Sequence, residues 1–340
     1  MQFGVFDHMD DSSVPLGQQI EERLQLIEAY ERFGFTSYHL AEHHGTPLGL
    51  APSPSVFMAA VAQRTTRLRF GPLVYLLPLY HPLRLIEEIC MLDQMSGGRF
   101  ELGVGRGISP IEVAFFGSDP ASGPRKFAEA LQVIQLGMQS DVLTFHGEFY
   151  DFENVPMALK PVQKPHPPLW YGVEKPETTV WTAANDANIV TLMPAERARA
   201  ITDRYRTEWE ALGKATDALP RMGLSRFIVL AETEAEAHQV ADRAYRPWRR
   251  NLEWLWIRNG IPIPLQLPPE FEPLRTHGGA FAGTPAGARA YIAEQVERAG
   301  VNYMVCDVAF GDMRREEALR TVELLGKEVI PAFVEAPASA

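Results

Sequence analysis

Short apolar runs alternate with amphipathic segments along the first part of the chain. Each apolar run is bounded by turn residues, as in a buried strand, and each following segment has apolar residues every three or four positions, as in a helix with one buried face. The predicted strands lie at residues 3–7, 36–42, 68–78 and 100–105, and the predicted helices at 16–34, 53–65, 82–98 and 125–139. Alternation of this kind implies a parallel sheet with helical crossovers.

The same rhythm resumes in the second half of the chain. Further strands are predicted at residues 168–173, 187–192, 224–232 and 301–308. Eight strands, each followed by a helix, fit an α/β fold of the closed (β/α)8 TIM-barrel type better than an open doubly wound sheet. We therefore expect a single barrel domain over residues 1–334, followed by a flexible tail at 335–340.

Two segments interrupt the repeat. Residues 145–168, after the fourth helix, predict a short hairpin and a proline-rich connection. Residues 260–285, before the last strand, are rich in Pro and Gly and show no helical period. Because long structureless loops in compact domains are commonly functional, we expect this second insertion to be a mobile lid. Its apolar residues indicate an apolar substrate, although any lid that closes on a barrel would be apolar: Ile261, Ile263, Leu265 and Leu267.

Composition narrows the function classes. The formal net charge is −11, which argues against nucleic acid and anionic membrane as partners. The Arg-rich stretch 245–260 is the exception, and its Trp spacing fits a buried helix face. Cys90 and Cys306 have neither disulfide nor zinc spacing and are expected to be core thiols. No signal peptide and no apolar window of about 18 residues is evident, so we expect a soluble cytoplasmic protein.

Candidate chemistry gathers where predicted strands end. In a barrel of this type, active sites lie at the carboxyl ends of the strands. Five strand ends are polar or glycine-rich: Asp7–His8, Glu42–His44, and residues 75–82, 103–112 and 172–179. We expect these five clusters to face one another across a single mouth.

The second of these clusters places Glu42, His43 and His44 side by side. Successive strand residues point to opposite sides, which disfavours one metal ion shared by both histidines. Two interpretations remain from these residues alone. They form either a polar strand end held by hydrogen bonds, or an acid–base site in which a histidine next to a carboxylate transfers protons near neutral pH.

Two further clusters could hold an anion. Arg106 lies among three glycines, Gly103, Gly105 and Gly107. This arrangement suits either a close approach of backbone and guanidinium to a phosphate or a tight turn. The glycine spacing is not that of the dinucleotide fingerprint. Residues 172–179 predict a helix that starts at Pro176 with Thr178 and Thr179 in its first turn, beside Lys175, which is either an anion site or a plain helix cap.

Several ordered motifs closely resemble those of the bacterial luciferase-like flavin monooxygenases. They are "AEHHGTP", "GPLVYLLPLYHP", "LDQMSGGRFELGVGRG", "AFFGSD", "GVEKPETTVWTAA" and "AGVNYMVC". The resemblance covers nearly the whole chain. It implies a (β/α)8 barrel that uses reduced FMN, supplied by a separate flavin reductase, and O2. A C(4a)-peroxyflavin would then oxidise a small-molecule substrate such as an aldehyde or ketone.

The resemblance also implies roles for residues at matching positions. His43 corresponds to the catalytic acid–base residue, with Glu42 beside it as a catalytic candidate that orients its neighbours. The Leu73–Val74 bond corresponds to a non-proline cis peptide that supports the flavin ring. We therefore predict a cis bond at this position.

Further matches concern cofactor binding. Arg106 corresponds to the residue that holds the flavin phosphate, and Glu174, Lys175 and Thr178 lie at matching positions of the same phosphate site. Glu112 corresponds to an acidic residue that affects flavin binding. The family further implies a homodimer through the helices at 16–34, 53–65 and 82–96.

The chain departs from the luciferase pattern in three places. Gly105 replaces a reactive cysteine, Lys175 replaces a small hydroxyl residue, and the Leu73–Val74 pair is bulkier than its counterpart. These changes put light emission in doubt and leave flavin binding intact. Two alternatives on the same barrel remain, namely a deazaflavin-dependent oxidoreductase that transfers hydride and a flavin-binding protein without turnover.

Overall fold

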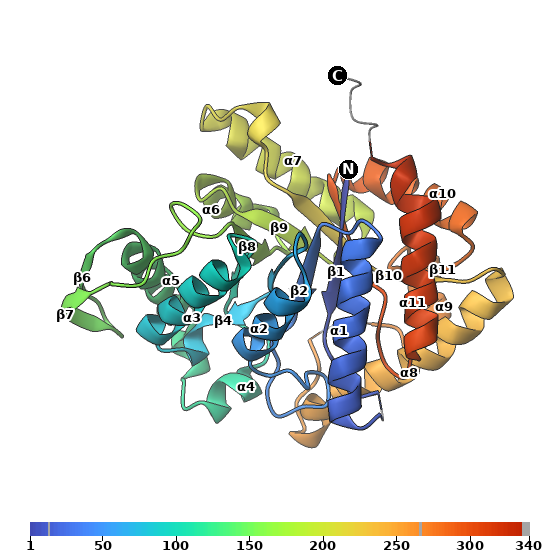
Figure 1. Ribbon diagram of the computed structural model, residues 1–340, viewed down its shortest axis with the longest axis horizontal. Coiled ribbons are helices and arrows are strands. Elements are labelled where there is room, and N and C mark those ends of the chain that lie inside the picture. The colour runs from blue at the N-terminus through green and yellow to red at the C-terminus, as the bar shows by residue number, and fades with distance from the viewer. Residues whose placement is uncertain (13, 265–266, 335–340) are drawn as a thin grey trace.

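A mostly parallel sheet curls into a barrel at the centre of the protein (Figure 1). A computed structural model describes residues 1–12, 14–264 and 267–334. The barrel strands are β1 (Gln2–Asp7), β2 (Ser37–Leu40), β3 (Arg69–Pro72), β4 (Tyr75–Leu76), β5 (Leu102–Gly105), β8 (Leu169–Gly172), β9 (Asn188–Thr191), β10 (Met222–Leu230) and β12 (Tyr303–Asp307). Their order is β3-β2-β1-β12-β10-β9-β8-β5-β4. Since β3 and β4 are two parts of one predicted strand, the ring is nearly closed, and the (β/α)8 prediction is confirmed.

The helices cover the outside of this barrel (Figure 1). They are α1 (Leu16–Arg32), α2 (Pro54–Arg64), α3 (Pro82–Ser96), α4 (Pro110–Phe115), α5 (Gly123–Gln139), α6 (Thr179–Ala184), α7 (Ala195–Ala211), α8 (Glu234–Arg258), α10 (Pro285–Ala299) and α11 (Arg315–Leu324). Helix α3 ends where Gly97 adopts the left-handed conformation (φ 63°) that caps the helix. Ser53 precedes Pro54 at the start of α2, and its side chain makes no capping hydrogen bond.

The barrel strands are buried on both faces, which explains their nearly continuous apolar sequences. All of β10 is buried, including Ser225 and Arg226. In β1, Gly4 faces the barrel interior, where a Cβ would lie 1.7 Å from the Tyr303 hydroxyl oxygen. Tyr303 therefore fills the barrel at this level, and only glycine fits opposite it.

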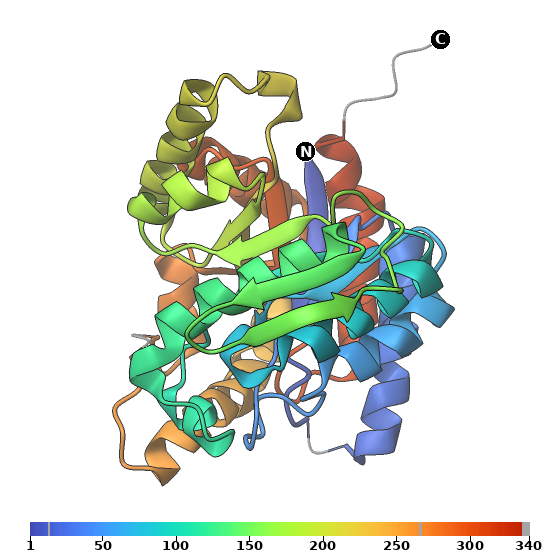
Figure 2. The same ribbon diagram turned by 90° about the vertical axis from the view of Figure 1, so that its left-hand side faces the viewer.

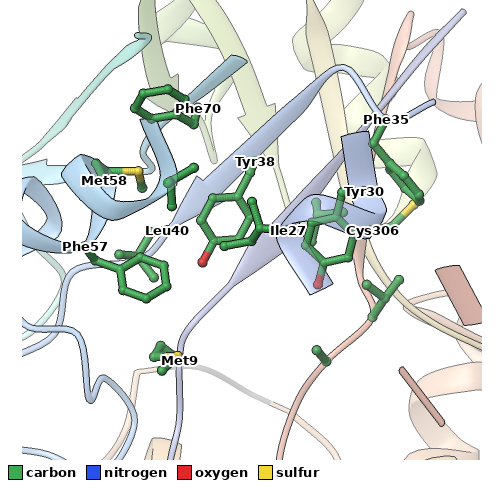
Figure 3. Close-up of a cluster of buried hydrophobic side chains, with 14 of the residues drawn as sticks. Met9, Ile27, Tyr30, Phe35, Tyr38, Leu40, Phe57, Met58, Phe70 and Cys306 are labelled. Carbon is green, nitrogen blue, oxygen red and sulfur yellow. The ribbon is translucent and has the colours of Figure 1, made fainter. Parts of the chain in front are cut away.

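The largest core lies between the first strands and the helices outside them (Figure 3). The rings of Tyr30 from α1 and Tyr38 from β2 stack there with centroids 6.1 Å apart. Cys90 and Cys306 are free and buried, as predicted for core thiols. Burial raises the pKa of Cys90 to about 11, so neither thiol site has the low pKa of a reactive cysteine.

The first insertion is the predicted hairpin. Strands β6 (Val142–His146) and β7 (Asp151–Pro156) pair antiparallel outside the barrel (Figure 2). The hairpin begins at residue 142, slightly before the expected boundary at 145. It packs on α5 and stays apart from the barrel sheet, because its two strands pair only with each other.

The second insertion differs from the prediction. Residues 260–285 contain helix α9 (Phe271–Thr276) and strand β11 (Ala280–Gly283), and β11 pairs in parallel with β10. The prediction of a structureless lid is therefore wrong for residues 271–283, because the small residues of "AFAG" form a strand that pairs with β10. Ile263 and Leu267 pack against the core, whereas Ile261 is exposed. Leu265 and the predicted tail at 335–340 lie outside the described residues.

The Arg-rich stretch belongs to α8, and most of its aromatic residues form a buried face as predicted, whereas Trp254 is 38% exposed. Tyr245, Trp248 and Trp256 are all buried there. Among the residues that the structure describes, no helix is long and apolar enough to cross a bilayer.

A buried charged cluster fixes the loop that follows β1. Arg23 of α1 pairs with Asp7, with 3.1 Å between Nε and Oδ2. The carboxylate of Asp10 accepts hydrogen bonds from the Asn251 side chain (3.0 Å) and from the backbone N–H of Gly311 (3.1 Å). Burial raises the pKa of Asp10 to about 7, and the hydrogen bond from Asn251 opposes this shift. The cluster joins α1, α8 and the loop after β12 directly beneath the mouth of the barrel.

Asp10 predicts a pH dependence of stability. Its pKa is higher in the folded protein than in the unfolded chain, so the contribution of Asp10 to stability is fully present below about pH 4 and is lost as the pH rises to about 7. Asp10→Asn keeps one acceptor oxygen and cannot ionise. Between pH 5 and pH 8 the free energy of unfolding should therefore fall by about 1–3 kcal/mol less in this variant than in the wild type. Urea denaturation measures the difference. The exposed control Asp217→Asn should leave the pH dependence unchanged, and equal slopes for all three proteins would contradict this account.

Candidate active site

A cavity of about 490 Å³ opens at the carboxyl ends of the barrel strands. The strand ends that the sequence predicted to face one mouth contribute to it from β2, β4, β5 and β8. All of the predicted site residues line this cavity: Glu42, His43, Leu73, Val74, Arg106, Glu112, Glu174, Lys175 and Thr178. The structure thus brings together residues that are up to 136 positions apart, from Glu42 to Thr178.

The adjacent histidines after β2 have separate carboxylate partners. Nδ1 of His43 lies 3.2 Å from Oε1 of Glu112. The same Glu112 oxygen accepts a hydrogen bond from the backbone N–H of His44 at 2.7 Å. Nε2 of His44 lies 2.7 Å from Oε1 of Glu42, and the backbone N–H of Leu76 donates to the other Glu42 oxygen at 3.0 Å. The carboxylate of the candidate acid–base histidine is therefore Glu112 and not its sequence neighbour Glu42. Within the described residues, no group of three or more His, Cys, Asp or Glu side chains could hold a metal ion.

Backbone packing behind His43 holds it in place. A Cβ on Gly49 would lie 2.8 Å from the Cβ of His43, so the loop after β2 folds back against this residue as only glycine permits. Gly45 starts that loop in the left-handed conformation (φ 65°). Glu42 is buried beneath, and burial raises its pKa against the opposing hydrogen bond from His44. His43 is thus fixed by its backbone and by Glu112.

The glycines at the end of β5 serve strand packing. A Cβ on Gly103 would lie 2.0 Å from the carbonyl oxygen of Pro72, and a Cβ on Gly105 would lie 2.4 Å from Cγ2 of Val74. The predicted cis peptide between Leu73 and Val74 is confirmed, and it separates β3 from β4. The neighbouring strand thus occupies the space beside Gly103 and Gly105. Gly107 adopts the left-handed conformation (φ 83°) of the predicted turn, and Gly105 and Gly107 both line the cavity.

Arg106 and Lys175 form a cationic wall on the other side of the cavity. Both side chains are exposed, and neither makes an ion pair or hydrogen bond with another residue in the described part of the chain. The predicted helix start at Pro176 is present as a 3-10 turn (Pro176–Thr178) that leads into α6. Thr178 lines the cavity, but the hydroxyl of Thr179 donates to the Pro176 carbonyl and is buried.

Sequence reasoning missed several inward-facing residues. Phe6 of β1, Tyr171 of β8, Val190 of β9 and Ser225 of β10 also line the cavity. These residues could have been predicted from the alternation of side chains along each strand. Phe6, for example, lies two residues after Gly4 and therefore on the same side of β1. Asp7, predicted at the mouth, instead faces α1, where it pairs with Arg23. His8 lies on the inward side, next to His43.

Comparison with known proteins agrees with this arrangement. The sequence model described as "Luciferase-like monooxygenase" matches residues 1–303. The chain belongs to this family. It is therefore an oxidoreductase of the monooxygenase type, and the resemblance seen in its motifs is confirmed.

Individual relatives extend over most of the chain. An uncharacterized protein, y4wF of Sinorhizobium fredii, is 42% identical over 97% of this chain and 96% of its own length. The oxygenase component of a flavin-dependent trigonelline monooxygenase from Acinetobacter baylyi is 29% identical over 78% of this chain and 76% of its own. The crystal structure of monooxygenase RslO1 from Streptomyces bottropensis superimposes with a TM-score of 0.89 at 26% identity, covering 98% of this chain and 100% of that one.

The contact between Gly105 and Val74 predicts a compensating pair of substitutions. Gly105→Ala places a methyl group against Cγ2 of Val74 and should destabilise the protein by about 1–3 kcal/mol, as overpacking does. In a Val74→Ala background this cost should fall below about 1 kcal/mol. Urea denaturation of the four proteins measures both values. Gly172→Ala, at another strand end with nothing near its Cβ, is the matched control. An equal cost for Gly105→Ala and Gly172→Ala would refute the contact.

Proposed function

We propose that this protein uses reduced FMN and O2 to insert one oxygen atom into a small, apolar organic substrate. The observation that carries the proposal is the division of one cavity between the His43–Glu112 pair and the unpaired cations Arg106 and Lys175. The flavin dependence of the trigonelline monooxygenase relative supports it.

The lining residues suit FMN. A cofactor with one phosphate and a flat, largely apolar ring needs concentrated hydrogen-bond donors at one end and apolar walls at the other. Arg106, Lys175 and Thr178 would hold the phosphate, since guanidinium, ammonium and hydroxyl groups are its usual partners. Glu174 would act there through its backbone, because its carboxylate would repel the phosphate. Leu73 and Val74 would support the ring.

When bound, reduced flavin supplies the two electrons that activate O2, so that one oxygen atom enters the substrate and the other leaves as water. The chain's own residues would manage the protons. With Nδ1 of His43 engaged by Glu112, Nε2 is the ring nitrogen left to exchange a proton in the cavity. Glu112 fixes the ring orientation and stabilises the protonated imidazole. Glu42 would hold His44 and the start of β4 in place.

The walls indicate the substrate class. Outside the charged clusters, the cavity is lined by apolar side chains that include Phe6, Val104, Ile108 and Leu192. Leu192 is 64% exposed, so the rim through which a substrate enters is itself apolar. We propose a neutral aldehyde, ketone or similar compound as the substrate.

The reduced cofactor would come from a separate flavin reductase. The trigonelline monooxygenase relative is named as an oxygenase component, which implies such a partner for that protein. In this chain, the glycines around Arg106 lack the spacing of a dinucleotide fingerprint. A division of labour between two proteins is therefore part of the proposal.

We also propose a homodimer through α1, α2 and α3. Val56 of α2 and Met91 and Met95 of α3 are 72%, 54% and 42% exposed, on two helices that pack side by side. Contiguous exposed apolar side chains commonly mark protein interfaces. Sedimentation of the wild type as a dimer and of Met91→Glu as a weakened dimer would support this, and a monomeric wild type would refute it.

Arg106→Ala should weaken binding of FMN. Loss of a charged hydrogen bond to phosphate costs about 1.5–3 kcal/mol, and we expect the dissociation constant to rise correspondingly. Quenching of flavin fluorescence measures the constant. Arg67→Ala, an exposed arginine before β3, is the control and should bind as the wild type does. Unchanged binding by Arg106→Ala would disprove the phosphate assignment.

Rapid mixing tests the reaction itself. Protein with photoreduced FMN is mixed with O2, and the absorbance is followed by stopped flow. We expect a transient species that free reduced FMN does not accumulate. His43→Gln should change its lifetime by at least about tenfold and leave FMN affinity intact, because proton transfer typically contributes a factor of about 10²–10⁴. Flavin oxidation at the free rate would exclude the proposed monooxygenase. Oxygen-independent hydride transfer from a reduced deazaflavin would favour the alternative oxidoreductase.

A further inference from the structure

His8 stacks on the candidate acid–base residue. Its ring centroid lies 5.8 Å from that of His43, with 18° between the two planes. Phe6 meets the His8 ring edge-on at 4.8 Å, and Trp248 of α8 meets it edge-on at 5.7 Å. The side chain of His8 is only 12% exposed. One face of the His43 imidazole is therefore covered by a second, largely buried imidazole.

The two rings have chemically different partners. Nδ1 of His43 faces the carboxylate of Glu112, which accepts a proton or a hydrogen bond. Nδ1 of His8 lies 3.5 Å from Nε1 of Trp248, and an indole N–H can only donate. Nδ1 of His8 must therefore be the unprotonated, accepting nitrogen. This assigns His8 the neutral tautomer with its proton on Nε2.

The surrounding charges favour the same state. Burial, His43 and Arg23 together lower the pKa of His8 to about 3. Oδ2 of Asp307 is 3.9 Å from Nδ1 of His8, but burial and the neighbouring Asp7 and Asp10 raise the pKa of Asp307 well above its usual range. The separation of 3.9 Å is too long for a hydrogen bond between Asp307 and His8. Of these two carboxyl groups, only that of Glu112 lies within hydrogen-bond distance of its histidine.

We propose that His8 is a positioning residue for His43, whose uncharged ring covers one face of the His43 imidazole and keeps it on Glu112, so that proton exchange is confined to His43. The catalytic consequence rests on the proposed function. The arrangement of the two rings does not, and it can be tested in the protein without flavin.

His8 combines two properties: a flat ring that packs against His43 and a nitrogen that accepts a hydrogen bond from Trp248. Its ring provides the flat surface against His43, which an aromatic side chain could also supply. Its Nδ1 accepts from the indole N–H of Trp248, which is buried and would otherwise lose its partner. His8→Phe keeps the first task, and His8→Asn keeps an acceptor near the position of Nδ1 but loses the ring.

The test compares these two variants by NMR of protein with ¹⁵N-labelled histidine, with the His43 signals assigned from His43→Gln. In His8→Phe we expect the Nδ1–H signal of His43 to persist, while Tm falls by a few degrees through the unpaired Trp248. In His8→Asn we expect Tm close to the wild type, while exchange of the His43 Nδ1–H with water becomes at least about tenfold faster. His277→Phe, at the exposed residue that follows α9, should change neither quantity.

Acidification gives a second readout. In His43→Gln the ring signals of His8 should shift at higher pH than in the wild type, because repulsion from His43 is removed. A slow Nδ1–H of His43 in His8→Asn would overturn the positioning role. Titration of the His8 ring near its ordinary pKa of about 6.5 would overturn the assignment of an uncharged ring. Failure of the stopped-flow experiment alone would affect neither result.

Discussion

The barrel depends on the close approach of β5 to the strand formed by β3 and β4. Three glycines lie at this seam, because a Cβ on Gly71 would lie 1.9 Å from the carbonyl oxygen of Glu101, and Gly103 and Gly105 meet Pro72 and Val74 in the same way. The Phe70–Phe100 bridge joins the two strands at its base. With no side chains between them, the strands close the ring, and any larger residue would push them apart. This closure carries the chain from Gly105 directly to Arg106 at the mouth.

The seam also separates the two walls of the cavity. On one side, β2 leads to His43, which α4 holds through Glu112. On the other side, β5 and β8 lead to Arg106 and Lys175. Between them, Leu73 and Val74 form an apolar surface. His43 and the two cations thus line one cavity from different strands of one rigid sheet.

The strands were predictable because buried parallel strands are nearly continuous apolar runs, as in β10. The lining residues were predictable because matching motifs placed them at strand ends. Two features were not. β11 consists of "AFAG", whose small residues resemble a loop until they pair with β10. The pairing of His43 with Glu112 spans 69 positions, and sequence adjacency favoured Glu42 instead. Local patterns determine which residues reach the mouth, but only the packing of α4 against the end of β2 determines which of them touch.

The contrast between the two ends of the barrel argues that the cations at the mouth serve a ligand. At the amino end, Arg69 and Arg221 both contact Oε1 of Glu101, at 2.7 and 3.0 Å, and the other Glu101 oxygen accepts from Trp170. Both of these cations therefore have an acidic partner within the protein. At the carboxyl end, Arg106 and Lys175 have no protein partner in the described chain, although the protein carries 43 acidic residues. These two cations beside an apolar cavity are the features on which the proposed binding of the flavin phosphate rests.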